Sequence, residues 1–173
     1  MHDPTFRQLY ERHFDHVWHT LRRFGVAERE LEDAAHDVFV VVHRKLSMFD
    51  PTRSARAWLS GIAWRVAADT RRRAHHRRET LDAQAGIDRP DRLPAPDEVL
   101  AAREARLLVE HALATLDLER RAVLVLCDID GASGPEAAEV LGIPLNTVYS
   151  RLRTARARFG ATVRRLTAIR GAA

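Results

Sequence analysis

The chain has 173 residues, enough for one domain or two small domains with buried cores. It carries a formal net charge of +4, and its single cysteine, Cys127, excludes an internal disulfide and a cysteine-cluster zinc site. No apolar run approaches the length of a membrane span, and the N-terminus lacks the apolar core of a signal peptide. We therefore expect a cytoplasmic protein without membrane insertion.

The charge is distributed unevenly along the chain. The first 50 residues hold nine acidic residues against seven Lys plus Arg, whereas the segment from Pro144 to the C-terminus holds seven arginines and no acidic residue. This asymmetry indicates a protein-facing surface near the N-terminus and a nucleic-acid-binding surface near the C-terminus.

Apolar residues at helical spacing predict two long helices in the first 50 residues. We expect the first to begin at a capping box of Thr5 and Gln8 and to end at Gly25. The second spans roughly residues 28–49. Its predicted inner stripe consists of Leu31, Ala35, Val38, Phe39, Val42 and Leu46.

A turn and a third helix follow. The turn is predicted at residues 50–53, because Pro51 disfavours helix in the residue before it. Ser54 is then expected to cap a helix that runs to about Arg73. The predicted inner face consists of Leu59, Ile62, Ala63, Val66 and Thr70. The opposite face, which we expect to be exposed, carries Ala57, Ser60, Gly61, Trp64, Ala68 and Arg71.

Trp64 is the most informative residue of this outward face. An indole among small residues is typical of a surface on which nucleic-acid bases stack, and the surrounding arginines could bind phosphates. The alternative is that Trp64 covers another helix of its own domain, because burial of its ring is favourable.

Residues 75–96 contain three prolines and few apolar side chains, which predicts a flexible linker. Helices resume after an N-cap at Asp97, at about residues 98–115 and 117–127. No alternating strand pattern is found in the sequence. We therefore predict an all-α protein of two small helical domains, residues 1–74 and 97–173, joined by this flexible linker.

The second domain ends in a predicted helix-turn-helix. A short helix from Pro135 to Leu141 meets a turn at Gly142, and a second helix follows with Val148, Leu152, Ala155 and Phe159 inward. Hydroxyl, amide and guanidinium groups on its remaining surface suit DNA base edges and phosphates. The candidate DNA-binding residues are Asn146, Thr147, Ser150, Arg151, Arg153, Thr154, Arg156 and Arg158. The alternative is an amphipathic surface helix with solvated arginines.

Both halves together resemble bacterial RNA polymerase sigma factors of the extracytoplasmic-function (ECF) type. EDAAHDVFVVVHRKL (residues 32–46) resembles region 2.2, and residues 49–73 resemble regions 2.3 and 2.4. Residues 116–156 resemble region 4. The chain departs from the family pattern at four places, namely His36-Asp37, Trp64-Arg65, Gly134-Pro135 and Tyr149.

The resemblance implies a sigma factor that binds core RNA polymerase and directs promoter-specific transcription initiation. Region 2 would bind the β′ clamp helices and the −10 element, and region 4 the β flap and the −35 element, through the candidate residues of the second helix. It also implies restraint by an anti-sigma factor. The implied polymerase-binding residues are Asp33, His36, Asp37, Phe39 and Arg44. The implied −10 residues are Asp50, Arg53, Arg56, Trp58, Ser60, Gly61, Trp64, Arg65, Arg71 and Arg72.

Other functions fit the sequence less well. His36-Asp37 is the pair found in HD-type metal phosphohydrolases, but no complete ligand set accompanies it, so we expect no catalysis and no metal or cofactor. His75-His76 is better explained as solvated linker than as a metal site. The remaining alternative is a stand-alone helix-turn-helix transcriptional regulator that does not require core polymerase.

Overall fold

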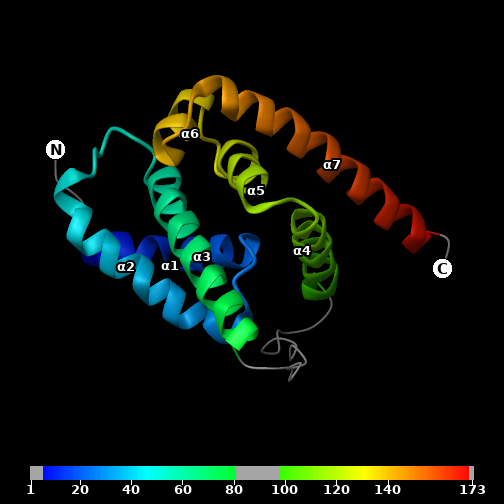
Figure 1. Cartoon of the computed structure of the whole chain (residues 1–173), viewed down its shortest axis with the longest axis horizontal. Helices are drawn as coiled ribbons and strands as arrows, with labels where there is room; N and C mark the ends of the chain where they lie inside the picture. The colour runs from blue at the N-terminus through cyan, green and yellow to red at the C-terminus, as the bar shows by residue number, and fades with distance from the viewer. Residues whose placement is uncertain (1–5, 81–97, 172–173) are drawn as a thin grey trace.

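The computed structural model of the chain describes residues 6–80 and 98–171, and every regular element within these ranges is helical (Figure 1). This confirms the predicted all-α class. Within the same ranges, no helix combines the length and apolar character that a membrane span requires.

Three helices form the N-terminal half: α1 (Phe6–Arg23), α2 (Leu31–Lys45) and α3 (Ala55–Thr80). Each packs against the other two around a continuous apolar core. Short 3₁₀ turns at Glu28–Glu30 (η1) and Leu46–Met48 (η2) flank α2. The predicted inner stripe of α2 is confirmed, since all its members are buried except the half-buried Leu46.

The end of α3 differs from the prediction. The helix continues past Arg73 to Thr80, so the first six residues of the predicted linker are helical. Residues 74–80 contain Ala, Arg and Glu and no Gly or Pro, a composition that favours continuation of a helix. The rest of that linker, residues 81–96, lies outside the described residues, as do the predicted caps Thr5 and Asp97.

The C-terminal half contains α4 (Glu98–Ala114), α5 (Leu118–Leu124), α6 (Gly134–Leu141) and α7 (Leu145–Gly171). Asp117 caps α5 by accepting a hydrogen bond from the Arg120 amide (2.9 Å). The expected regular helix over 117–127 is interrupted, because α5 passes into a π-helical turn, η3 (Val125–Ile129). There the amide of Asp130 bonds to the carbonyl of Val125, five residues earlier.

The helix-turn-helix forms as predicted. Gly142 adopts a left-handed backbone (φ 67°) between α6 and α7. Of the predicted inner stripe of α7, Val148, Leu152 and Ala155 are buried, and Phe159 is half-buried against the core. A capping box that the sequence analysis missed fixes the start of α6, where Ser133 and Glu136 each accept a hydrogen bond from the other's backbone amide.

The two halves pack against each other. α6 and η3 contact α3, and α4 contacts α1. In Figure 1, α6 lies beside the first turns of α3, while α7 extends away from the N-terminal half. The candidate −10 face of α3 therefore meets the helix-turn-helix domain.

Candidate nucleic-acid and polymerase interface

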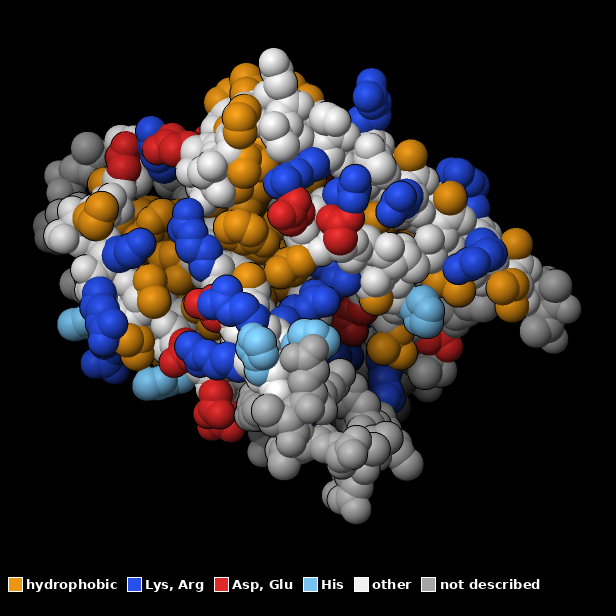
Figure 2. All heavy atoms as spheres, in the orientation of Figure 1, with side chains coloured by type: hydrophobic (Ala, Val, Ile, Leu, Met, Phe, Trp, Pro, Cys, Tyr) orange, Lys and Arg blue, Asp and Glu red, His pale blue; other side chains and the backbone are white. Residues whose placement is uncertain are grey.

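The surface of α7 carries the eight candidate DNA-binding residues, and none of them is buried. Asn146, Ser150 and Arg153 are exposed and follow one another at helical spacing on the first turns. On the face in view in Figure 2, Lys and Arg side chains gather over α3 and along α7. The first turns of α7 thus present polar and cationic groups outward.

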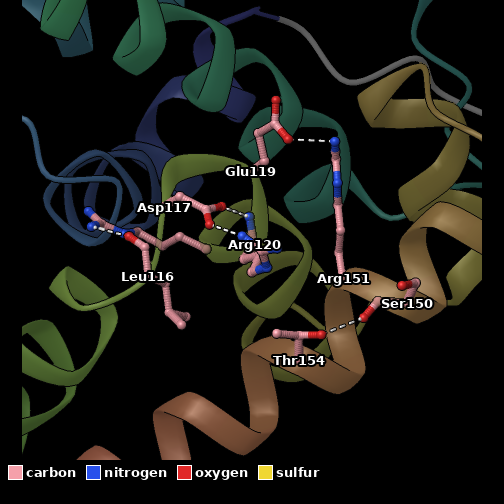
Figure 3. Close-up of polar contacts among 8 residues, drawn as sticks. Leu116, Asp117, Glu119, Arg120, Ser150, Arg151 and Thr154 are labelled. Carbon is pink, nitrogen blue, oxygen red and sulfur yellow. Dashed lines mark hydrogen bonds and ion pairs between the residues drawn. The ribbon is translucent and has the colours of Figure 1, made fainter.

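Three of these residues make contacts within the second domain. Arg151 reaches back to α5, with Nη2 2.5 Å from Oε2 of Glu119, and the Thr154 hydroxyl donates to the carbonyl of Ser150 (Figure 3). Arg156 pairs with Asp128 of η3. These two arginines therefore hold α7 to its own domain, whereas Arg153 and Arg158 extend into solvent.

The candidate −10 loop is an ordered turn. Oδ1 of Asp50 accepts hydrogen bonds from the amide (2.9 Å) and hydroxyl (2.6 Å) of Thr52, and these lower the pKa of Asp50. The rings of Phe49 and Trp58 lie 4.8 Å apart, centroid to centroid. Both rings line a cleft of about 360 Å³ whose opposite wall is formed by residues of α6.

The expectation that Ala57, Ser60 and Gly61 are exposed is wrong. Ala57 and Ser60 are 3% and 0% exposed, and Gly61 is also buried. A β-carbon at Gly61 would overlap Cγ1 of Val140 on α6. The small residues of α3 therefore allow close approach of the chain's own α6.

A buried polar cluster joins η3 to α3 and α1. The Ser60 hydroxyl donates to Oδ2 of Asp130 (2.6 Å), and Nε2 of His16 lies 3.0 Å from the same hydroxyl oxygen. Burial raises the pKa of Asp130, an effect that the Ser60 hydrogen bond and Arg23 oppose. Burial, followed by the positive charge of Arg56, lowers the pKa of His16 to about 4, so His16 is neutral at pH 7.

Three further arginines of α3 are also engaged. Nη2 of Arg65 donates to the carbonyl of Val140 (2.7 Å), Nη1 of Arg71 donates to the carbonyl of Phe24, and Arg72 pairs with Asp69 one turn away. Trp64 is half-buried against the core, and its indole N–H is enclosed without a partner among the described residues. Trp64 is therefore neither the exposed residue nor the fully buried residue that the two sequence-based alternatives predicted.

The candidate polymerase-binding residues lie on α2. Asp33, His36 and Arg44 are exposed, and Asp37 is half-buried with Oδ2 4.0 Å from Nη1 of Arg73. Phe39, by contrast, is only 4% exposed. It packs among the aromatic side chains Phe6, Tyr10 and Phe14. The structure therefore places Phe39 in the core beneath this surface.

Metal-binding geometry is not found in the part of the chain that the structure describes, where no three His, Cys, Asp or Glu side chains converge. Cys127 is half-buried, and burial raises the pKa of its thiol, which lowers its reactivity. Among the described residues, no further His or Asp side chains join His36 and Asp37 to complete the ligand set that an HD site needs.

The fold and the outward-facing recognition helix define a two-domain protein of the helix-turn-helix class. The family profile described as "Sigma-70 region 2" matches residues 9–78, and that described as "Sigma-70, region 4" matches residues 106–159. The chain is 36% identical over 165 residues to RNA polymerase sigma factor CnrH of Cupriavidus metallidurans, covering 91% of this chain and 85% of that protein. The chain belongs to the sigma-70 family of RNA polymerase sigma factors, in its ECF group.

Other relatives agree with this placement. The ECF RNA polymerase sigma factor SigE of Mycolicibacterium smegmatis is 32% identical over 155 residues, which span 88% of this chain and 59% of that protein. The structure of CnrH in complex with the cytosolic domain of CnrY matches with a TM-score of 0.62 and 34% identity, over 90% of this chain and 85% of that one. The sigma factor RpoE of Bartonella quintana, solved with the anti-sigma factor NepR, shares the fold (TM-score 0.67, 19% identity, 92% and 96% coverage).

Proposed function

We propose that this chain is a sigma factor that binds core RNA polymerase and directs promoter-specific initiation. Residues 1–74 would act as region 2 and residues 97–173 as region 4, with residues 75–96 between them. The observation that carries the proposal is the occurrence of both regions, in order, in one chain. A stand-alone regulator does not bind core polymerase, so its function would not require region 2.

Region 4 would hold the −35 element through the first turns of α7. Asn146, Ser150 and Arg153 are exposed together there, so the helix can enter a major groove with an amide, a hydroxyl and a guanidinium toward base edges and phosphates. Thr147 and Arg158 extend this surface on either side. Arg151 and Arg156 would act chiefly by fixing the helix on its domain.

Region 2 would bind the melted −10 strand at the start of α3. The Asp50 turn and the Phe49–Trp58 ring pair form one wall of a cleft, which suits a base that has left the duplex. Arg53, Arg56, Arg65, Arg71 and Arg72 would supply cationic groups for the phosphates. Ser60 and Gly61 are buried beneath α6, so they would support this surface from within, with the half-buried Trp64 beside them.

The exposed face of α2 would dock on the β′ clamp helices of the polymerase. Asp33, Asp37 and Arg44 share this face by helical spacing, with His36 beside them. Phe39 would support the face from beneath by fixing α2 on α1. Region 4 would contact the β flap.

The proposed role requires no catalysis by this chain and places it in the cytoplasm with the polymerase. Its relative CnrH has been solved with the cytosolic domain of CnrY. We extend this to the present chain and propose an anti-sigma factor as its regulatory partner.

The test is reconstituted transcription. Purified protein is added to sigma-free core RNA polymerase with fragmented genomic DNA, and transcript start sites are mapped. We expect a small set of start sites that share two upstream elements. A chain that binds DNA fragments but forms no stable complex with core polymerase would instead be the stand-alone regulator.

Variants of the α2 surface sharpen the test. The double substitution Asp33→Ala/Arg44→Ala should weaken core binding and leave the melting temperature unchanged, because both side chains are exposed. Asp15→Ala, which removes an exposed carboxylate from α1, serves as the matched control and should bind core like the unmodified chain. Equal binding by all three proteins would exclude this face of α2.

A further inference from the structure

We infer that the chain has a binding site for a small phosphate-class anion at the C-terminal end of α1, formed by Arg71 of α3 and Arg121 of α5. Free inorganic phosphate and the phosphate group of a nucleotide share the chemistry that this site recognises. The inference goes beyond the proposed function, because it requires neither polymerase nor promoter DNA. In Figure 1 the end of α1 lies beside α3 and close to α5, which belong to different halves of the chain.

The end of α1 is turned by Gly25, which takes a left-handed backbone (φ 80°). Its amide bonds to the carbonyl of Arg22, and the amide of Val26 bonds to the carbonyl of Leu21. This pattern satisfies two of the carbonyls that a helix leaves without partners at its C-terminus. The helix end also carries a partial negative charge, equivalent to about half an elementary charge, and so attracts cations.

Two guanidinium groups converge on this helix end. Nη1 of Arg71 donates to the carbonyl of Phe24 (2.9 Å), and Nη1 of Arg121 donates to that of Arg23 (3.4 Å). The groups meet beside Gly25, where a β-carbon would lie 3.3 Å from Nη1 of Arg71 and 2.6 Å from Nη1 of Arg121. One tetrahedral anion at this point could therefore accept hydrogen bonds from both arginines.

The positive charge of the two guanidinium groups is not balanced by carboxylates. The acidic residues of this region pair with other arginines: Glu28 and Glu110 with Arg22, and Asp117 with Arg120. Among the residues that the structure describes, neither guanidinium group of the site forms an ion pair. Two full positive charges thus face a helix end that carries only about half a negative charge.

Arg121 is the buried member of the pair. It is 5% exposed and donates from Nη2 to the carbonyl of Leu116 (3.0 Å), but its Nε is enclosed without a partner in the described structure. Burial is the main cause that lowers the pKa of Arg121 to about 10, the charge of Arg71 lowers it further, and Asp117 opposes both. A bound anion would supply the counter-charge that this buried cation lacks.

The site is open to solvent on one side. Gly25 and Arg71 are exposed, so a small anion can approach there, whereas a DNA duplex is too wide to reach Arg121 beneath them. A free or terminal phosphate carries up to about two negative charges near pH 7, which suits two converging cations. Because Arg71 and Arg121 belong to different halves, the bound anion would join the halves and stabilise the folded chain by mass action.

The test is calorimetric titration of the purified full chain with sodium phosphate, in a buffer free of phosphate and sulfate and at constant ionic strength. Adenosine diphosphate serves as the nucleotide probe. Arg71 is also proposed to bind −10 phosphates, so a short mixed-sequence single strand of DNA is the third probe. Arg71→Gln and Arg121→Gln each remove one charge of the site. Arg165→Gln, which removes an exposed arginine from the far part of α7, is the matched control.

We expect one phosphate to bind per chain, and each site variant to weaken its affinity at least about tenfold, because each loses charge-assisted hydrogen bonds. The control should bind like the unmodified chain. Phosphate should raise the midpoint of thermal unfolding of both these proteins, but not that of Arg71→Gln. Arg71→Gln changes an exposed residue, so it carries the test if Arg121→Gln does not fold.

The two sources of phosphate are then distinguished. Tighter binding of adenosine diphosphate than of phosphate, with the same dependence on both arginines, would identify a nucleotide as the ligand. Equal or weaker binding would identify free phosphate.

No saturable binding of either small probe would overturn the site. An equal loss of affinity in Arg165→Gln would also overturn it, because the attraction would then reflect net charge alone. A single strand that displaces phosphate and depends on both arginines would assign the site to the DNA backbone and overturn the small ligand. Since the small-probe titrations contain no polymerase or DNA, their result is independent of whether the chain acts as a sigma factor.

Discussion

The guanidinium of Arg156 donates two hydrogen bonds to the carboxylate of Asp128, from Nε to Oδ2 (2.9 Å) and from Nη2 to Oδ1 (2.6 Å). This pair ties the middle of α7 to the π turn η3, and the carboxylate raises the pKa of Arg156. Arg153, three residues earlier, is exposed on the same helix. The two arginines therefore have different roles despite their proximity in the sequence.

We expect Arg153→Ala to weaken binding of −35 duplex and to reduce the slope of log affinity against log salt by about one, as for a lost phosphate contact. Arg156→Ala should instead lower the melting temperature, because it releases α7 from η3, and should change the salt slope less. Fluorescence anisotropy over a salt series and calorimetry measure the two effects. Identical salt slopes for both variants would contradict this division.

Tyr149 and Gly134 form a packing pair across the helix-turn-helix. A β-carbon at Gly134 would lie 2.8 Å from the Tyr149 ring. Gly134→Ala should therefore destabilise the chain by about 1 kcal/mol in urea unfolding, since the ring must move away. In a Tyr149→Ala background the same substitution should be neutral or stabilising, because Ala is the better helix former. Equal effects in both backgrounds would mean that the two residues are independent.

Trp64 contributes to the stability of the fold, so its substitution should affect folding as well as any DNA binding. Since the ring is half-buried against the core, Trp64→Ala should cost about 2 kcal/mol, less than a fully buried Trp. Trp64→Phe removes an enclosed N–H that has no partner in the described structure, so it should keep most of the stability. Chemical denaturation of the three proteins tests this. A Trp64→Ala variant as stable as the parent would restore the exposed position predicted from sequence.

Acid should destabilise the fold through the histidines of α1. Burial is the main cause that lowers the pKa of His13, His16 and His19, and neighbouring arginines lower it further. Between about pH 6.5 and pH 4 these histidines are protonated in the unfolded chain but largely neutral in the folded chain. The free energy of unfolding therefore falls as pH falls through this window. His16, with a pKa of about 4, would contribute at most about 3 kcal/mol.

Urea unfolding at pH 7 and pH 5 measures this loss. His16→Gln keeps a hydrogen-bond donor for Ser60 but cannot titrate, so it should show a smaller difference between the two pH values. Asp130 acts in the opposite direction, because its raised pKa lets the folded chain hold a proton. An equal pH dependence in His16→Gln and the parent would show that His16 does not carry the effect.

Periodicity and turn residues were sufficient to predict most of the fold. The stripes of α2 and α7 and the turn at Gly142 follow local rules of helix geometry and glycine conformation, and these appear in a short window of sequence. The predicted end of α3 is too early, because a polar composition is common to linkers and to solvated helix ends. The π turn could not be predicted, because it lacks a sequence signature of its own.

The site was predicted less completely, for a physical reason. Ser60 and Asp130 are 70 residues apart, so neither reveals the other in the sequence. Glu139 resembles any exposed acidic residue of a short helix until its distance to Arg53 is measured. Phe39 lies on the inner stripe of α2, and that pattern already indicated the burial that the structure confirms.

Gly61 gives the contact between the two domains a simple dependence on side-chain size. Any residue larger than glycine at this position would meet Cγ1 of Val140, so the Val140 side chain or α6 would have to move. The position therefore couples the packing of the two halves to the size of a single side chain, because α6 and α3 can lie this close only where that side chain is a hydrogen atom.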